Sequence, residues 1–252
     1  MYLCSCTREQ LLSLFPKDGV VAEIGTAEGA FARSILDAAK PRLLHLIDPW
    51  EHFAEGAYTA DFSNVSAERQ DARHQDVLKK FAAEIADGQV VVHRATSAAA
   101  LADFADGEFD WIYVDGLHTE EGVHADLTAY AAKLKPHGFI SGHDYTNNPL
   151  ADRQGFGVIE AVNRFAVETD FRLILITREA FPTYVLARAG AGVDRLIGGL
   201  FFSGAVVTAI EGYPETGTFI HRFYEVGDRR GLVPVFTMSS GTEGDKSGSG
   251  ET

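Results

Sequence analysis

Four side chains that could do chemistry come at the ends of two apolar stretches of the sequence. Asp115 and His118 follow one stretch, and the adjacent pair His143 and Asp144 follows the next. If the two stretches are neighbouring parallel strands, their ends meet at one edge of a sheet and the four side chains converge. Carboxylates and imidazoles placed together can hold a metal ion or move a proton.

Three interpretations of this set stay open. In the first, Asp115, His143 and Asp144 hold a divalent metal ion that binds substrate oxygens and lowers the pKa of a hydroxyl group. Such a mixed set is compatible with Mg, Mn, Fe or Zn, and we favour Mg or Mn over Zn or Fe, although the harder ions prefer oxygen ligands and the set includes a His. In the second, no metal takes part and His118 or His143 is a general base. In the third, His143 and Asp144 only hydrogen-bond to loops.

A second pattern, Glu23-x-Gly25-x-x-x-Gly29, lies where an apolar strand turns into a helix. The free backbone N–H groups of such a turn, which includes Thr26, suit a polar or negatively charged ligand. The spacing differs from the dinucleotide pattern G-x-G-x-x-G, because position 27 is Ala and an acid precedes the first glycine. The Glu23 carboxylate would repel a pyrophosphate but could pair with an ammonium group.

Asp48 ends the next apolar strand, 25 residues after Glu23. In nucleoside-binding α/β folds an acid at this point accepts hydrogen bonds from ribose hydroxyls, and we favour this role over that of a turn cap. Trp50 follows at once, and the sequence is equally compatible with a contact to the ligand and with a place in the core.

These residues require strands and helices that alternate along the chain. An apolar antiparallel pair at 171–176 and 183–187 closes the predicted sheet. The alternation predicts an α/β fold with a doubly wound, mostly parallel, seven-stranded sheet. The other strands are predicted at 20–24, 43–48, 89–93, 109–115 and 139–145, and the helices at 8–15, 28–39, 76–86, 98–104 and from Thr119 onward. A turn at 135–138 separates the last of these helices from its strand.

Three segments have no place in this alternation. The stretch 51–72 lacks a clean period and predicts a long loop or partial helix of the kind that often forms a lid. We divide the chain into a ligand-binding domain at 1–190, a C-terminal appendage at 191–237 and a disordered tail at 238–252. The appendage is expected to cover the active site or to supply a contact in a homo-oligomer, such as a dimer.

The composition excludes several classes of partner. The net charge of −14 argues against nucleic acid, which needs a basic surface. No apolar run is long enough to span a membrane, and the start lacks the pattern of a signal peptide, so we expect a cytoplasmic protein. Cys4 and Cys6 are too few for a disulfide scaffold and are expected to be reduced thiols.

Two blocks of the sequence resemble one branch of the class I S-adenosylmethionine (SAM) methyltransferases. They are Tyr113-Val114-Asp115-Gly116-Leu117-His118-Thr119-Glu120-Glu121-Gly122-Val123, followed by Asp126-Leu127, and Leu134-Lys135-Pro136-His137-Gly138-Phe139-Ile140-Ser141-Gly142-His143-Asp144-Tyr145. The branch usually has Lys-Pro-Gly-Gly before its fifth strand, so His137 is a departure. The resemblance covers about residues 18–188 and implies a Rossmann-like fold.

What the resemblance implies for the ligand agrees with the residues above. The methionine part of SAM would lie on the glycine turn, its ribose on Asp48 and its adenine beside Ser97. The implied cofactor-binding residues are Glu23, Gly25, Thr26, Gly29, Asp48, Trp50, Ser97 and Asp115. Metal-dependent O-methyltransferases of the branch place acids after the fourth strand and an acidic pair after the fifth, where this chain has His143 and Asp144.

We therefore expect a SAM-dependent methyltransferase that methylates a hydroxyl of a small molecule such as a sugar, a phenol or a natural-product intermediate. The residues expected to be catalytic are His118, His143 and Asp144. One alternative is a nicotinamide-dependent oxidoreductase on the same kind of sheet, against which Glu23 and the missing second glycine count. Another is a module that binds SAM without transferring its methyl group.

Overall fold

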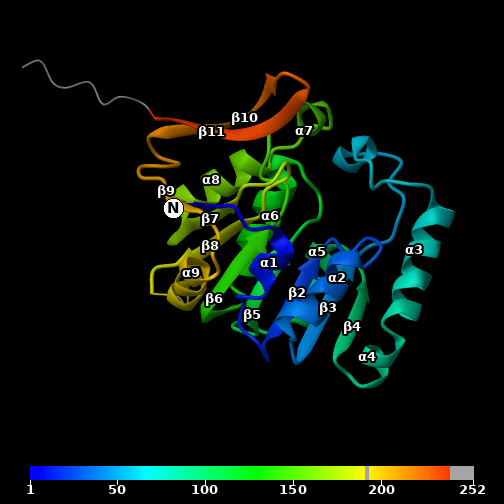
Figure 1. The fold of residues 1–252 in the computed structure, drawn as a ribbon. Coiled ribbons are helices and arrows are strands. Elements are labelled where there is room, and N and C mark those ends of the chain that lie inside the picture. Colours follow the sequence, from blue (N-terminus) through cyan, green and yellow to red (C-terminus); the bar gives the residue numbers. More distant parts are fainter. Residues whose placement is uncertain (191–192, 239–252) are drawn as a thin grey trace, which may run out of the picture.

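The computed structural model describes residues 1–190 and 193–238, and its main element is one large mixed sheet (Figure 1). The strand order is β4-β3-β2-β5-β6-β8-β7-β1-β9. The strands are β1 (Tyr2–Cys4), β2 (Val20–Ile24), β3 (Leu43–Asp48), β4 (Val90–Arg94), β5 (Phe109–Val114), β6 (Leu134–Gly142), β7 (Phe171–Thr177), β8 (Tyr184–Arg188) and β9 (Val207–Ala209).

Strands β4, β3, β2, β5 and β6 run parallel, and β8 lies antiparallel between β6 and β7. The predicted Rossmann-like α/β fold is therefore confirmed. The prediction of seven strands is wrong by two, because β1 and β9 extend the sheet beyond β7. Each is three residues long, too short to show the alternation by which a strand is recognised in a sequence.

Backbone hydrogen bonds continue past the strand ends and fix the loops that carry the site. The N–H of Gly25 donates to Ile47 O at 2.9 Å, that of Asp115 to Ile24 O at 2.8 Å, and that of His143 to Val114 O at 3.1 Å. The loops after β2, β5 and β6 therefore lie side by side at the carboxyl edge. This is the convergence that the sequence predicts.

Helices cover both faces of the sheet (Figure 1). Buried apolar residues of α5, α6 and α8 form the core on one face, and those of α1, α2, α3 and α9 form it on the other. The helices are α1 (Arg8–Leu12), α2 (Ala30–Ser34) with a π-helical turn (Ile35–Ala39), α3 (Ala67–Lys80), α4 (Ala82–Ala86), α5 (Ser97–Ala100), α6 (Glu120–Ala131), α7 (Pro149–Arg153), α8 (Val158–Glu168) and α9 (Val193–Phe202), with 3₁₀ turns at Ala57–Ala60 and Leu101–Asp103. None of the helices within 1–190 and 193–238 has the length and apolar character needed to cross a membrane.

Two boundaries differ most from the prediction. Helix α3 begins at Ala67, so the loop after β3 is shorter than the predicted 51–72. The buried residues of this helix are Gln70 and Val77, so its sequence has no apolar period that would mark the first residue. The predicted turn at 135–138 instead belongs to β6, which begins at Leu134 and shifts register against β5 before Phe139. That irregularity accommodates Pro136, which has no N–H to donate to a regular ladder.

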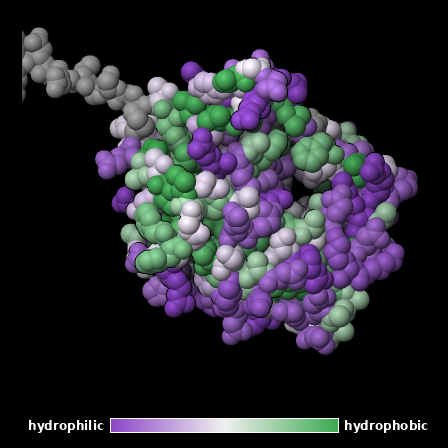
Figure 2. Space-filling model, viewed as in Figure 1, coloured by the Kyte–Doolittle hydropathy of each residue, from purple (hydrophilic) through white to green (hydrophobic). Residues whose placement is uncertain are grey.

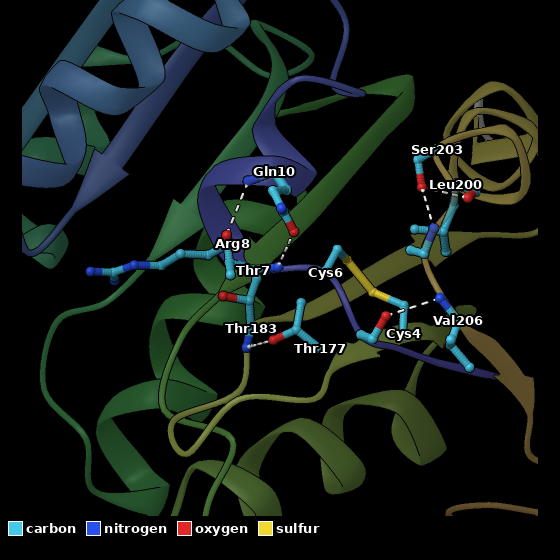
Figure 3. The surroundings of a disulfide bond; sticks show 12 residues. Cys4, Cys6, Thr7, Arg8, Gln10, Thr177, Thr183, Leu200, Ser203 and Val206 are labelled. Carbon is cyan, nitrogen blue, oxygen red and sulfur yellow. Dashed lines mark hydrogen bonds between the residues drawn. A yellow bond between two sulfur atoms is a disulfide. The ribbon is translucent and has the colours of Figure 1, made fainter.

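The prediction that Cys4 and Cys6 are reduced thiols is wrong. The structure joins them in a disulfide, with their Cα atoms 5.5 Å apart and both side chains buried (Figure 3). Ser5 between them is held by Val206, whose N–H donates to Ser5 Oγ and whose carbonyl accepts from Ser5 N, both at 2.9 Å. This local turn brings the two cysteines together, and a count of cysteines cannot reveal it.

The segment after residue 192 adds a strand and a helix to the main sheet and its core. Strand β9 pairs with β1, and Leu196 and Leu200 of α9 are buried in the core. The last two strands, β10 (Gly217–Val226) and β11 (Arg229–Met238), form an antiparallel hairpin. The hairpin docks on the loop after β6, where His221 Nδ1 lies 2.9 Å from Thr146 Oγ1. A contact in an oligomer stays a prediction, and the tail predicted at 238–252 lies, from residue 239 on, outside the described residues.

Candidate functional site

The turn after β2 is packed too closely for side chains at its two glycines. Gly25 has a φ of +87°, and a Cβ added there would lie 1.9 Å from the carbonyl oxygen of Asp115. Gly29 has a φ of +66°, and its Cβ would lie 2.8 Å from the ring of Phe81. Both glycines are therefore required by the packing of the turn itself, which leads into α2.

Glu23 is a buried acid with one oxygen that lacks a hydrogen-bond partner among the described residues. Its side chain is 2% exposed, and Oε2 has no hydrogen-bond partner among the described residues. Burial raises the pKa of this carboxyl well above its usual value. Glu23 also lines the largest cavity of the site. An acid at the wall of a cavity, with one buried oxygen unpaired, fits a ligand that brings a donor, such as the ammonium group of SAM.

Asp48 holds the backbone of the same turn. Its Oδ2 accepts from the N–H of Ala27 at 2.9 Å and its Oδ1 from the N–H of Trp50 at 2.7 Å. Each carboxylate oxygen can accept a further hydrogen bond, and Asp48 lines a second cavity of about 290 Å³. The position is compatible with the predicted contact to ribose.

Trp50 does not line either cavity of the site. Its side chain is fully buried, its indole N–H donates to Ala27 O at 2.8 Å, and its ring lies 4.9 Å from that of His74. The structure therefore places it in the core behind the turn. Of the two roles that the sequence left open, the geometry supports the structural one.

The second cavity has a polar edge that sequence analysis found only in part. Ser97 lines it as predicted, and its hydroxyl donates to Asp126 Oδ1 at 2.5 Å. Asp126 was not singled out, although it lies between Val123 and Leu127 on the buried face of α6. The sequence signal for Asp126 was the presence of an acid on the inward face of a predicted helix. With apolar walls from residues such as Ile47, this cavity suits a purine ring.

The burial of Asp126 predicts a measurable pH dependence. Burial raises its pKa from 3.8 to about 6, so between these values the folded state binds a proton that the unfolded state releases. The free energy of unfolding should therefore fall as pH rises through this range, by about 3 kcal/mol at about 1.4 kcal/mol per pKa unit. Urea unfolding from pH 4 to 7 should show this slope in the wild type relative to Asp126→Asn. The same dependence of the unfolding free energy on pH in both proteins would contradict it. Asp87→Asn, at an exposed position, is the control and should behave as the wild type does.

His118 is the centre of the polar cluster at the ends of β5 and β6. Its Nε2 lies 2.9 Å from Asp144 Oδ2 and 3.4 Å from Asp115 Oδ1. Its Nδ1 lies 2.9 Å from Oδ2 of Asp61, which comes from the loop after β3. The imidazole is 7% exposed and stacks on Phe156, with ring centroids 4.4 Å apart. Sequence analysis missed Asp61, whose only signal was its place in the predicted lid.

His143 belongs to the same cluster through Asp144. Its Nδ1 lies 2.9 Å from Asp144 Oδ1 and 3.9 Å from Asp115 Oδ2. Asp144 thus bridges two imidazoles, one on each carboxylate oxygen. It is 6% exposed and has a φ of +62°, a left-handed conformation that Asp tolerates better than most residues.

These contacts shift the pKa values of the cluster in a consistent direction. Burial alone would lower the pKa of His118, but hydrogen bonds to Asp115, Asp144 and Asp61 outweigh it and raise the value well above normal. Burial would raise the pKa of Asp144, but hydrogen bonds from His118 and His143 hold it below its usual value. The cluster therefore favours imidazolium–carboxylate pairs.

Arg8 is a further cluster residue that the sequence did not reveal. It is the first residue of α1, which Thr7 caps, and its side chain extends away from the disulfide (Figure 3). The guanidinium lies 4.5 Å from the centre of the Phe31 ring, with Nη1 3.7 Å from Asp115 Oδ2. It brings a positive charge to the cavity wall beside Asp115.

The residues whose geometry could hold a metal ion differ by one from the set predicted from the sequence. Ligand atoms of Asp115, His118 and Asp144 all lie within 4.8 Å of one another, which is the one such group in the described residues. His118 thus replaces His143 in the set. Two carboxylates and one imidazole are suitable donors for a divalent ion, so these residues fit the metal that the resemblance implies.

One cavity of about 730 Å³ connects the two halves of the site. Glu23 and Gly25 of the turn line it together with Asp115, His118 and Asp144 of the cluster. A hollow is visible in Figure 2 beside the hydrophilic surface that includes α3. The apolar part of the wall comes from the loop after β3, the segment 149–156 and the loop between β7 and β8. Its side chains are Phe62, Leu150, Phe156 and Phe181.

Solved structures of several enzymes are similar to this chain. A spermidine synthase of Thermotoga maritima is 19% identical, with 71% of this chain and 57% of that chain covered and a TM-score of 0.46. A precorrin-6y methyltransferase of Geobacter metallireducens is 16% identical over 71% and 85%, with a TM-score of 0.47. A tRNA methyltransferase of B. subtilis is 16% identical over 75% and 68%, with a TM-score of 0.45.

This chain spans 58% and 57% of the length of two spermidine synthases to which it is similar. No curated protein matches its sequence. The sequence profile of a methyltransferase-domain family matches residues 22–145, which include the glycine turn and the polar cluster apart from Arg8. Residues 22–145 are therefore similar to a methyltransferase domain.

Proposed function

We propose that the protein transfers the methyl group of SAM to a hydroxyl oxygen of a small molecule. The observation that carries this proposal is the shared cavity, which has the glycine turn on one side and the carboxylate–imidazole cluster on the other. A methyl donor held on the turn would present its sulfonium to an acceptor held at the cluster. Holding the two reactants in line accounts for much of the rate of such a displacement.

The cofactor would use both cavities. Its ammonium group would pair with Glu23, which lacks a partner for Oε2, and its carboxylate would meet the N–H groups of the turn. The ribose hydroxyls would donate to Asp48, and the adenine would lie in the second cavity against Ser97 and Asp126. The same unpaired Glu23 disfavours a pyrophosphate, and with it a nicotinamide dinucleotide.

The cluster would activate the acceptor. A neutral hydroxyl is a weak nucleophile, so its proton must leave as the new O–CH₃ bond forms and the S–CH₃ bond of the sulfonium breaks. Without a metal, the Asp144 carboxylate, paired with His118, would take up this proton, and S-adenosylhomocysteine would leave as the neutral thioether. With a divalent ion, Asp115, His118 and Asp144 would be its ligands instead, and the ion would supply a Lewis acid that lowers the pKa of the hydroxyl.

The cavity wall narrows the class of acceptor. Phe62 and Leu150 are 64% and 46% exposed, and with Phe156 and Phe181 they line the cavity that the cluster faces. Apolar side chains of this size favour an acceptor with an aromatic or other apolar body over a free sugar. Of the acceptors that the sequence left open, a phenol or an apolar natural-product intermediate fits best.

Calorimetry and a product assay test the proposal. We expect SAM to bind, NAD not to bind, and S-adenosylhomocysteine to form with some members of a panel of phenols, with sugars as the comparison. EDTA should lower this activity and Mg²⁺ or Mn²⁺ should restore it. Affinity for NAD but not SAM would favour the oxidoreductase. Affinity for SAM without product from any panel member would favour a binding module.

A further inference from the structure

The loop between β3 and α3 contacts both cavities of the site. Phe53 and Tyr58 line the second cavity, where the adenosine part of the cofactor is proposed to bind, and Phe62 and Ser63 line the larger one. Asp61 lies between these two pairs of residues. We define residues 51–66 as the lid, which Figure 1 shows beside α3 and facing α7.

Asp61 is the point at which the lid reaches the catalytic cluster. It is 9% exposed, and its Oδ2 lies 2.9 Å from Nδ1 of His118. Its other oxygen accepts from the N–H of Ser63 at 2.7 Å, which orients the carboxylate. Each oxygen of Asp61 thus has its own partner, one inside the lid and one outside it.

Further contacts hold the lid in this position. The side chain of Asn64 accepts from Phe53 N at 3.0 Å and donates to Phe53 O at 2.9 Å, which ties the two ends of the lid together. From α3, Gln70 and Arg73 both donate to Ser63 O at 2.9 Å. Arg73 also pairs with Glu28 of the glycine turn, at 2.6 Å. The lid is therefore connected to the cofactor turn as well as to His118.

We propose that Asp61 is a positioning residue that holds the imidazole of His118 by Nδ1, so that Nε2 faces Asp115 and Asp144. A histidine ring nitrogen is oriented by the hydrogen bond that the other nitrogen makes. Because Asp61 belongs to the lid, this orientation depends on the lid being docked. The catalytic role of His118 in this inference rests on the proposed function.

The lid also couples SAM binding to the contact between Asp61 and His118. A cofactor that fills the second cavity against Phe53 and Tyr58 holds the lid closed, and the closed lid presents Asp61 to His118. Asp61 already contacts His118 in this position of the lid, so bound SAM should strengthen the contact rather than create it.

Nitrogen-15 NMR of His118 tests the positioning role without any methyl acceptor. In the wild type, Nδ1 should carry a proton in a hydrogen bond. In Asp61→Ala this signature should be lost, and in Asp61→Asn, which keeps the size of the side chain, it should be weakened. Glu51→Gln, an exposed acid of the same lid, is the control and should match the wild type. Unchanged His118 signals in a folded Asp61→Ala protein would overturn the proposal.

Proteolysis and kinetics test the coupling. SAM should slow cleavage within 51–66 in the wild type, and Asp61→Ala should lose most of this protection; equal protection would overturn the coupling. With an acceptor found in the panel, the kcat of Asp61→Ala should be ~10–100-fold below that of the wild type, while the KM for the acceptor stays unchanged. If SAM does not bind at all, the proposed function fails, whereas the NMR comparison still decides whether Asp61 positions His118.

Discussion

Replacement of Asp144 by asparagine should reduce methyl transfer by ~10²–10⁴-fold, the usual contribution of a positioned proton-transfer group, while SAM binding stays close to that of the wild type. Asp144 bridges His118 and His143 with one oxygen on each ring, at 2.9 Å in both cases. An amide in its place keeps the shape but cannot accept a proton from the acceptor. Calorimetry with SAM and a S-adenosylhomocysteine assay measure the two effects.

Asparagine is the right replacement because of the backbone. Asp144 has a φ of +62°, which Asn adopts far more readily than Ala, so Asp144→Asn isolates the loss of the carboxylate from backbone strain. Asp144→Ala should lose as much activity and some stability in addition. Exposed Asp152→Asn on α7 is the matched control and should keep full activity. Full activity in Asp144→Asn would contradict the catalytic assignment.

The part of the fold that carries the site could be predicted because apolar runs and their polar ends are local signals. Strands β2 and β3 have the predicted bounds, and the acids at 23, 48 and 115 lie where their strand ends place them. Hydrogen bonds between adjacent strand ends then bring the loops together.

The missing site residues depend on contacts between distant segments. Asp61 and His118 are 57 positions apart in the sequence. Arg8, near the start of the chain, is farther still from its partner Asp115. Neither contact has a periodic or spaced signature in the sequence. The exchange of His143 for His118 in the metal set has the same cause, since only the observed side-chain positions show which imidazole nitrogen shares a point with both carboxylates.

Replacement of Gly25 by alanine should cost more stability than any other single change in the cofactor turn. A Cβ at this position would lie 1.9 Å from the carbonyl oxygen of Asp115, so the ends of β2 and β5 would have to move apart. A backbone clash of this kind belongs to the rare class of substitutions that cost more than ~4 kcal/mol, out of a total stability of ~5–15 kcal/mol. SAM binding should be lost with the geometry of the turn. Urea unfolding and calorimetry measure the two losses.

Gly88 provides a control that separates the clash from the conformation. It also has a positive φ, +74°, but nothing lies within 4 Å of an added Cβ. Gly88→Ala should therefore cost only the ~1–2 kcal/mol of a left-handed backbone and leave SAM binding intact. The difference between the two variants measures the close approach of the turn to Asp115. If both variants lose the same stability and Gly25→Ala still binds SAM, the turn can move enough to accommodate the added Cβ. Gly25 would then be needed only for its positive φ.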